Sequence, residues 1–192
     1  MTTLPVSDPF PTPFSEMDWR AWKPVEQATL LFVVDGRRIL LIEKKRGLGA
    51  GKINGPGGRM EPGETPIACA IREVEEEILI TPVDPQPAGE LFFQFTDGYA
   101  LHGFVFRSEG WSGEPGETEE ALPFWCDTDR IPYDRMWADD RIWFPLFLAN
   151  RPFQGRFLFD GDRMLGHAIE ELASPRDFRV DATCRPGSFR FV

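Results

Sequence analysis

The sequence contains few of the residues that build disulfide frameworks or cysteine-based metal sites. Its 192 residues include three cysteines and two histidines. Cys69, Cys126 and Cys184 are odd in number and widely separated, and no two have the close spacing of a metal-binding pair. His102 and His167 are isolated, and we assign them no role. The pattern excludes a disulfide-stapled secreted domain and indicates reduced thiols.

We expect neither a leader nor a membrane span, and the sequence has no excess of positive charge. The opening residues, MTTLPVSDPFPTPF, have neither a basic start nor an apolar run. No stretch approaches the roughly 20 apolar residues of a membrane span. The formal net charge of −10 disfavours attraction to nucleic acid. We therefore expect a cytoplasmic protein that binds neither nucleic acid nor membrane, and we take a monomer as its expected state.

The chain does contain enough apolar material for one packed domain. The hydrophobic fraction is 42%, and there are 17 phenylalanines. Residues 1–24 are rich in proline and aromatics without periodicity, which predicts an irregular arm. That arm either lies loosely on the surface or packs on the core or on a partner. We expect the domain itself to span residues 25–172 and residues 173–192 to form a C-terminal tail.

Strand patterns separated by turns run through the central region. Asp35-Gly36 and Asp97-Gly98 each lie between two β-rich runs and predict two hairpins. Residues 122–127 read as a further strand. Residues 153–172 predict a last hairpin, although their second limb is also compatible with a helix.

Two segments have helical spacing. Thr65 and Pro66 suit the N-cap and the first helical position, and apolar residues recur at helical intervals as far as Leu79. Residues 138–150 predict a second helix, interrupted near Pro145. Strands interspersed with two helices predict an α+β fold, a mixed β-sheet sandwiched between α-helices in an α/β/α arrangement.

The pentapeptide EPGET occurs twice, at residues 61–65 and 114–118. Arg and Glu follow the last Glu of the first copy at eight and nine residues. Trp125 and Cys126 occupy the corresponding positions after the second copy. We therefore interpret the second copy as turn composition.

The first helix carries a cluster of glutamates that needs an explanation. Glu73, Glu76 and Glu77 fall on one helical face, where like charges repel by roughly 0.2–0.5 kcal/mol per pair. They also lie toward the C-terminal end, where the helix dipole disfavours anions. Such a cluster is typical either of a solvated acidic face or of a bound cation, and Mg²⁺ prefers oxygen ligands of this kind.

The loop before that helix favours the cation. Between residues 44 and 59 the chain carries five basic residues, several glycines and no acid. A basic, glycine-rich loop beside a carboxylate-bearing helix suits a polyphosphate held by cations and metal together. The two segments together predict a site for a metal-bound polyphosphate.

Residues 58–80, GRMEPGETPIACAIREVEEEILI, resemble the Nudix box. In that pattern a glycine is followed by five residues, Glu, seven residues and then R-E-U-x-E-E-x-G-U, where U is bulky and aliphatic. The matching positions are Gly58, Glu64, Arg72, Glu73, Val74, Glu76, Glu77 and Ile80. Leu79 replaces the last glycine, which normally ends the helix at positive φ, so the local turn is expected to differ or to be strained.

Three further stretches resemble the branch of MutT homologues that hydrolyse oxidised purine nucleoside triphosphates. They are the loop at residues 44–58, the strand GELFFQF, and residues 129–159 with their W-x-D-D element. The likeness covers roughly residues 29–165. Aromatic residues of the animal branch are replaced here by Leu48, Ile53 and Pro56, so the preferred modified purine is not predicted.

The resemblance implies a role for each matching residue. Asn54 would bind the purine edge, Asp139 and Asp140 would face the base, Trp137 would stack on it, and Phe93 would line the pocket. Thr29 and Lys44 would lie near the sugar and phosphates, and Gly57 and Gly58 would also bind the substrate. The metal ligands would be the Gly57 carbonyl, Glu73, Glu76, Glu77 and Glu120.

The Asp139-Asp140 pair has two interpretations. Acids are favourable in the first turn of a helix, so the pair is compatible with a simple helix start. In a dry pocket, two adjacent carboxyls ionise together only at high cost, so one would keep a proton. A protonated and an ionised Asp would then read an altered purine edge. The family context favours this second interpretation.

The expected reaction is metal-assisted hydrolysis of a modified purine nucleoside triphosphate to monophosphate and pyrophosphate. Mg²⁺, with Mn²⁺ as a substitute, would be the cofactor, and Arg72 would orient a glutamate. Glu73, Glu76 and Glu120 remain alternative general bases. Two alternatives to this function are another Nudix substrate, such as a dinucleotide or nucleotide sugar, and a Nudix domain that binds nucleotide without chemistry.

Overall fold

The computed structural model describes residues 14–47 and 49–182. In that part of the chain a mixed eight-stranded sheet has the order β10-β9-β5-β6-β1-β2-β3, with β8 paired to β2, and β4 and β7 form a separate pair. The strands are β1 (Glu26–Asp35), β2 (Arg38–Lys44), β3 (Ile53–Asn54), β4 (Thr81–Val83), β5 (Gln86–Phe95), β6 (Ala100–Ser108), β7 (Gly110–Ser112), β8 (Ala121–Asp127), β9 (Phe153–Asp160) and β10 (Arg163–Glu171).

Pairing within the sheet follows the predicted hairpins. β1–β2, β5–β6 and β9–β10 are antiparallel neighbours, and β1–β6 and β5–β9 are parallel. The mixed sheet is therefore confirmed. The second limb of the last hairpin is a strand, β10, rather than a helix.

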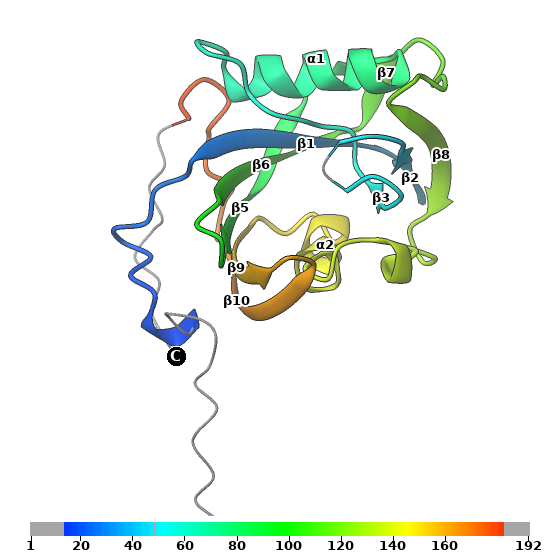
Figure 1. Ribbon diagram of the computed structural model, residues 1–192. Coiled ribbons are helices and arrows are strands. Elements are labelled where there is room, and N and C mark those ends of the chain that lie inside the picture. The colour runs from blue at the N-terminus through cyan, green and yellow to red at the C-terminus, as the bar shows by residue number, and fades with distance from the viewer. Residues whose placement is uncertain (1–13, 48, 183–192) are drawn as a thin grey trace, which may run out of the picture.

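Two α-helices cover opposite faces of the sheet, as Figure 1 shows. Alternate side chains of β1 pack on opposite faces of the sheet. Leu31 and Val33 pack with helix α1 (Pro66–Ile78), whereas Phe32 packs with helix α2 (Asp140–Leu148). This alternation follows from the two-residue period of a strand. The predicted α/β/α arrangement is confirmed. Neither helix has the length and apolar character of a membrane span.

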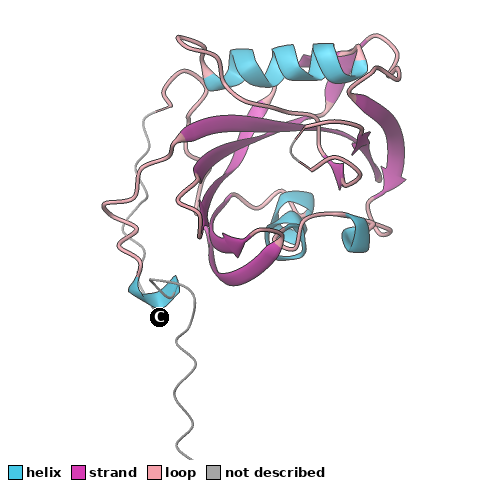
Figure 2. Cartoon of the chain, viewed as in Figure 1, coloured by secondary structure: helices cyan, strands magenta, loops and turns pink. Residues whose placement is uncertain are grey.

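Helix α2 runs without a break through Pro145 to Leu148. The predicted interruption near Pro145 is therefore absent. A proline leaves the carbonyl four residues earlier without a helical donor. Here that carbonyl belongs to Arg141, which is exposed and can be solvated. The remaining regular elements are two short 3-10 turns, η1 (Phe14–Glu16) and η2 (Tyr133–Arg135), among the loops of Figure 2.

Both terminal segments pack on the sheet over the residues that the structure describes. In the N-terminal arm, Trp19 and Trp22 are buried, and the Trp22 ring meets Phe92 edge-on at 5.5 Å. In the C-terminal segment, Phe178 is buried against Phe104 and Phe106. The packed form of the arm is therefore the correct alternative for residues 14–24. The domain boundaries remain predictions.

Candidate functional site

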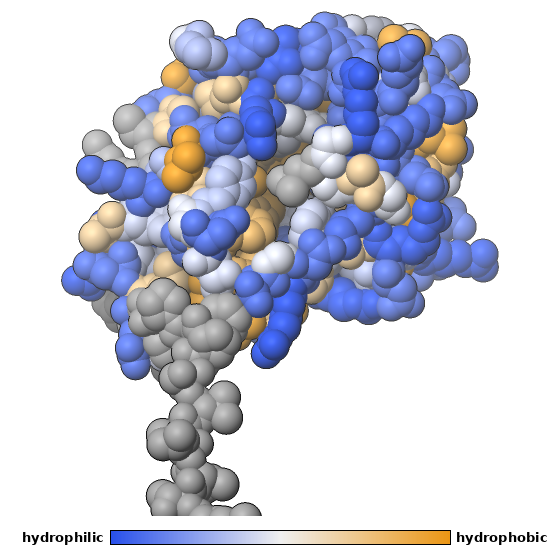
Figure 3. All heavy atoms as spheres, in the orientation of Figure 1, coloured by the Kyte–Doolittle hydropathy of each residue, from blue (hydrophilic) through white to orange (hydrophobic). Residues whose placement is uncertain are grey.

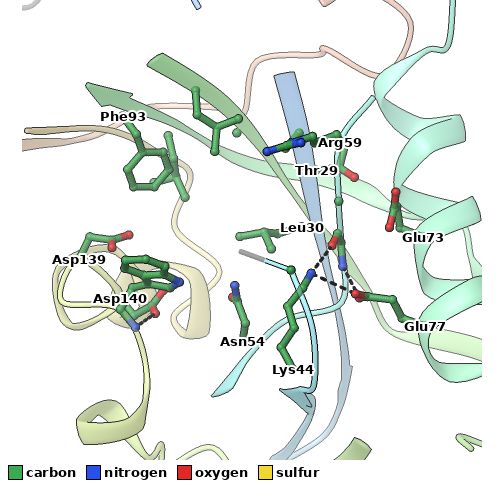
Figure 4. A pocket seen from close by; sticks show the side chains of 18 of the residues that line it. Thr29, Leu30, Lys44, Asn54, Arg59, Glu73, Glu77, Phe93, Asp139 and Asp140 are labelled. Atoms are coloured by element: carbon green, nitrogen blue, oxygen red, sulfur yellow. Dashed lines mark hydrogen bonds and ion pairs between the residues drawn. The ribbon is translucent and has the colours of Figure 1, made fainter. Parts of the chain in front are cut away.

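A pocket of about 540 Å³ opens between the sheet, the start of α2 and the C-terminal half of α1. Figure 3 shows apolar residues inside a recess whose rim is hydrophilic. In Figure 4, Asp139, Asp140 and Phe93 lie at one end and the glutamates of α1 at the other, with Asn54 and Lys44 between them. We call these the base end and the phosphate end.

Helix α1 places the glutamates of the phosphate end. The Thr65 hydroxyl caps its first turn by accepting from the Ala68 amide at 3.3 Å. Leu79 ends the helix with φ of 65°, in the left-handed region where the Nudix pattern has glycine. The helix thus ends in the usual way, and Leu79 carries the strain that was predicted as one outcome.

Arg72 holds three glutamates around the helix. Its Nε lies 2.9 Å from Glu64 Oε1, and its Nη1 lies 2.9 Å from Glu73 Oε1 and 3.0 Å from Glu76 Oε2. Glu73 lines the pocket. Glu76 is exposed and is not one of the described residues that line the pocket. Burial, together with Glu77 and Glu76, raises the pKa of Glu73, and Arg72 opposes that rise.

Glu77 is the buried carboxylate of the phosphate end, with 1% of its side chain exposed. It accepts from the Gly57 amide at 2.9 Å and from Lys44 Nζ at 3.1 Å. The same ammonium lies 3.4 Å from the Gly57 carbonyl. Burial raises the pKa of Glu77, and the charge of Glu120 on the facing loop raises it further.

Gly57 and Gly58 lie so close to β1 and to helix α1 that neither position has room for a side chain. A Cβ at Gly57 would lie 2.0 Å from the Thr29 carbonyl oxygen, and one at Gly58 would lie 2.3 Å from Glu73 Oε2. Any larger residue would therefore push the loop off β1 or off the helix. Thr29 lines the pocket as well, and its hydroxyl lies 3.3 Å from the Cys69 thiol.

The donors of the phosphate end fit a hard divalent cation. The Gly57 carbonyl and the Glu77 carboxylate already face one positive group, the Lys44 ammonium, and Glu73 and Glu120 line the same pocket. All of these donors are oxygens, which Mg²⁺ and Mn²⁺ prefer. Within the described ranges, no three acidic, His or Cys side chains are arranged as a ready metal cluster. Instead, cations of the chain hold them apart: Arg72 on Glu73, Lys44 on Glu77 and Arg46 on Glu120.

The base end contains two buried acids whose hydrogen-bond donors are uncharged. Asp139 and Asp140 are each 3% exposed. Asp139 Oδ2 accepts from Trp143 Nε1 at 3.0 Å, and Asp140 Oδ2 accepts from the Trp137 amide at 2.9 Å. Burial raises the pKa of Asp139 to about 6. Burial and the charge of Asp139 raise the pKa of Asp140 well above its ordinary value.

These contacts bear on both interpretations of the acid pair. Asp139 stands at the N-cap position of α2, yet its carboxylate makes no capping hydrogen bond and turns to Trp143 instead. The pair therefore starts the helix and also lines the pocket.

Aromatic rings and one amide complete the base end. Phe93 stacks on Phe157 with ring centroids 5.4 Å apart, and Trp137 meets Phe159 edge-on at 6.2 Å. Asn54 Oδ1 accepts from the Gly55 amide at 2.8 Å, and no residue in the described ranges accepts a hydrogen bond from its amide nitrogen, which can therefore donate to a ligand. Ile53 and Pro56 are buried and are absent from the described residues that line the pocket. Leu48 lies outside the described residues.

The structure brings most of the predicted site residues together in one pocket. The lining residues among them are Thr29, Lys44, Asn54, Gly57, Gly58, Glu73, Glu77, Phe93, Glu120, Trp137, Asp139 and Asp140. Arg72 and Glu76 lie beside it, in contact with Glu73 through the guanidinium.

Sequence reasoning missed a polar group at the pocket rim. Arg59 Nε lies 2.8 Å from Glu26 Oε2, which also accepts from the Tyr99 hydroxyl at 2.5 Å. Arg59 and Tyr99 line the pocket, as does Arg46. The two arginines were part of the basic loop, but nothing in the sequence pattern assigned them a partner.

The comparisons with known proteins agree with this architecture. The NUDIX domain model matches residues 15–147. The oxidized purine nucleoside triphosphate hydrolase of Danio rerio is 43% identical over 148 residues, which cover 75% of this chain and 94% of that protein. The protein of the same name from Mus musculus is 38% identical, and the match covers 76% of this chain and 95% of that protein.

A solved structure supports the fold independently. The crystal structure of the mutator MutT protein from Bacillus halodurans has a TM-score of 0.69 and 27% sequence identity, over 76% of this chain and 98% of that one. The predicted Nudix resemblance and fold are confirmed by these matches.

Proposed function

Because this chain belongs to the Nudix family, we propose that it hydrolyses oxidised or otherwise modified purine nucleoside triphosphates and so removes them from the nucleotide pool. Substrates of the 8-oxo-dGTP and 2-hydroxy-dATP class would yield the nucleoside monophosphate and pyrophosphate. The observation that carries the proposal is a single pocket with two different ends, one with buried acids and one with carboxylates facing cations. The names of the relatives from Danio rerio and Mus musculus support the same substrate class.

At the base end, the acid pair would select the base by hydrogen bonding. With one proton retained between them, Asp139 and Asp140 offer a donor and several acceptors, with which they would read the edge of a modified purine. The free amide nitrogen of Asn54 would donate from the other side of the pocket. Trp137 and Phe93 would hold the ring plane by stacking and apolar contact.

At the phosphate end, Glu73, Glu77, Glu120 and the Gly57 carbonyl would hold the divalent cation, for which we propose Mg²⁺. Nudix hydrolases generally use divalent metal ions. When bound, such an ion neutralises the polyphosphate and lowers the pKa of a bound water. Lys44 would contact phosphate oxygens, since its ammonium already lies at the junction of Glu77 and Gly57.

Arg72 would orient the acid that takes the proton from the attacking water. It holds Glu73 at the pocket wall and Glu76 away from it. Because a general base has to reach its proton directly or through one water, Glu73 and Glu120 are better placed for this role than Glu76. The half-buried carboxylate of Glu73 has a raised pKa, which makes it a better proton acceptor than an ordinary glutamate.

The test is a substrate panel with Mg²⁺: 8-oxo-dGTP, 2-hydroxy-dATP, O6-methyl-dGTP, dGTP and ADP-ribose, each followed by kcat/KM and product identity. We expect at least one modified triphosphate to exceed dGTP by about 10-fold or more, with pyrophosphate as the released product. Preference for ADP-ribose would indicate another Nudix substrate class. Absence of metal-dependent pyrophosphate release from every triphosphate would contradict the proposal.

A further inference from the structure

The second copy of EPGET lies at the opposite end of the helix that the first copy begins. In the first copy, Thr65 caps the N-terminus of α1. In the second copy, Thr118 donates its hydroxyl to the Glu77 carbonyl at 2.9 Å, and the Gly116 amide donates to the Ile78 carbonyl at 3.0 Å. These carbonyls belong to the last turn, where a helix offers them no partner of its own. The second copy, which the sequence presented as turn composition, thus caps the end of α1 opposite to the one that the first copy caps.

The Thr118 hydroxyl uses its full hydrogen-bonding capacity. Besides donating to the Glu77 carbonyl, it accepts from the Glu120 amide at 3.1 Å and from the Ala121 amide at 3.3 Å. A hydroxyl has one donor and two acceptor positions, and all three are engaged. One oxygen atom therefore joins the backbone of Glu77 on the helix to the backbone of Glu120 on the facing loop.

Lys45, which directly follows β2, holds this loop in place. Lys45 Nζ donates to the Thr118 carbonyl at 2.6 Å and pairs with Glu117, and the Lys45 amide donates to the Glu120 carbonyl at 2.8 Å. Its neighbour Lys44 contacts Glu77. The end of β2, the end of α1 and the second EPGET loop are thus tied at one point.

The tie matters because the two carboxylates that it brings together repel each other. Glu77 and Glu120 both line the phosphate end, and the charge of Glu120 raises the pKa of Glu77. Repulsion favours movement of the loop away from the helix, which would widen the gap between the two acids. A short hydrogen-bonded link opposes that movement.

We propose that Thr118 is a positioning residue that sets the spacing between Glu77 and Glu120 for a divalent cation. This inference rests on the proposed function for the identity of the ligand. Thr118 itself does not touch the cation or the substrate; it acts through the backbone of two residues whose side chains do. Partners of this kind typically contribute 10- to 100-fold to metal affinity.

The experiment compares the two threonines of the repeat. Thr118→Val removes the hydroxyl and keeps the shape, Thr118→Ser restores the hydroxyl, and Thr65→Val is the matched control at the other end of the same helix. Mg²⁺ and Mn²⁺ affinity is measured by calorimetry on the full chain. We expect Thr118→Val to weaken binding by about 10-fold or more, while Thr118→Ser and Thr65→Val stay within about 3-fold of the unmodified protein.

Amide hydrogen exchange gives a second readout without metal. The Glu120 and Ala121 amides should exchange faster in Thr118→Val and at the original rate in Thr65→Val, although both variants lose one helix-end hydrogen bond. Thr118→Ala repeats both measurements as a second hydroxyl-free variant in case Thr118→Val does not fold.

The outcomes separate the inference from the function on which it rests. If the unmodified protein binds metal and Thr118→Val binds it equally well, the role of Thr118 is wrong and the proposed function stands. If the unmodified protein binds neither metal, the proposed function fails and the role of Thr118 fails with it. Weakened binding in Thr118→Val, with faster exchange at Glu120, supports the inference.

Discussion

The carboxyl groups at the two ends of the pocket have different partners, which are charged at the phosphate end and uncharged at the base end. At the phosphate end, each predicted metal ligand lies beside a cation of the chain, as Glu77 does beside Lys44 and Glu120 beside Arg46. At the base end, Asp139 and Asp140 are buried as Glu77 is, but their hydrogen-bond donors are a neutral indole and a backbone amide.

The difference separates two uses of the same functional group. A cation beside a carboxyl favours its ionised form and opposes the effect of burial, and the carboxyl can exchange that cation for a metal ion or leave it to a phosphate. A carboxyl that is buried away from cations keeps its proton more easily and becomes a hydrogen-bond donor as well as an acceptor. The pocket is thus suited to a ligand that is neutral and polar at one end and highly charged at the other.

The largest effect is expected from Glu77→Gln at the phosphate end. The amide keeps the shape but removes the negative charge that a divalent cation needs, so kcat should fall by roughly 10²- to 10³-fold. Steady-state hydrolysis of 8-oxo-dGTP at saturating Mg²⁺ measures this.

Glu75→Gln is the matched control for that variant. Glu75 lies on the exposed side of the same helix, where it accepts from the Thr81 hydroxyl at 2.7 Å, a bond that the amide oxygen can keep. Its activity should be unchanged. Equal activity of the two variants would show that the phosphate end does not depend on the buried carboxylate.

Asp139→Ala should remove selectivity rather than chemistry. Loss of a buried charged or polar partner is worth about 3 kcal/mol, so kcat/KM for the modified triphosphate should fall by about 10²-fold. The value for dGTP should change much less, and metal affinity should not change. A uniform fall for both nucleotides would mean that the base end does not read the base.

The raised pKa of the acid pair also predicts how stability depends on pH. Asp139 has a folded-state pKa of about 6 against an ordinary value of 3.8. Between these values the folded protein holds a proton that the unfolded chain has released, so this contribution is complete below about pH 4 and is lost as pH rises through about 6. The difference amounts to about 3 kcal/mol over those two units.

Urea unfolding of the unmodified protein and of Asp139→Asn at several values between pH 4 and pH 7 measures that contribution. The variant should gain stability relative to the unmodified protein as pH rises, because its amide does not ionise. A difference in free energy of unfolding that stays constant with pH would contradict the assignment.

The smallest effect concerns the helix end that carries the glutamates. Leu79 is 57% exposed and has φ of 65°, so Leu79→Gly should raise the free energy of unfolding by roughly 0.5 to 1 kcal/mol without altering activity. Leu122→Gly is the control, since Leu122 is also exposed but lies in β8, where glycine should lower stability by a similar amount. Loss of activity in Leu79→Gly would show that the strained turn contributes to the phosphate end.

The features that the sequence predicted well are those encoded locally. Helix α1 begins at the predicted cap and ends one residue before Leu79, because Thr65, Pro66 and the apolar spacing all lie within the helix or next to it. The site residues carried over from the family motifs largely meet in one pocket although they come from distant segments, because the resemblance implied the fold that joins them.

The features that the sequence did not predict depend on contacts between distant segments. Lys44 and Glu77 are 33 residues apart, and Thr118 lies 41 residues from the carbonyl that it caps. No local pattern reports such pairs. The buried arm did leave one signal, because Trp19 and Trp22 stand three residues apart in an otherwise polar stretch, and large aromatic rings usually find an apolar partner.

The most direct test of the central claim is calorimetric titration of the protein with Mg²⁺ in the presence of a non-hydrolysable 8-oxo-dGTP analogue. The claim predicts saturable binding that is lost in Glu77→Gln and retained in Glu75→Gln. Absence of binding by the unmodified protein, or equal binding by both variants, would contradict it.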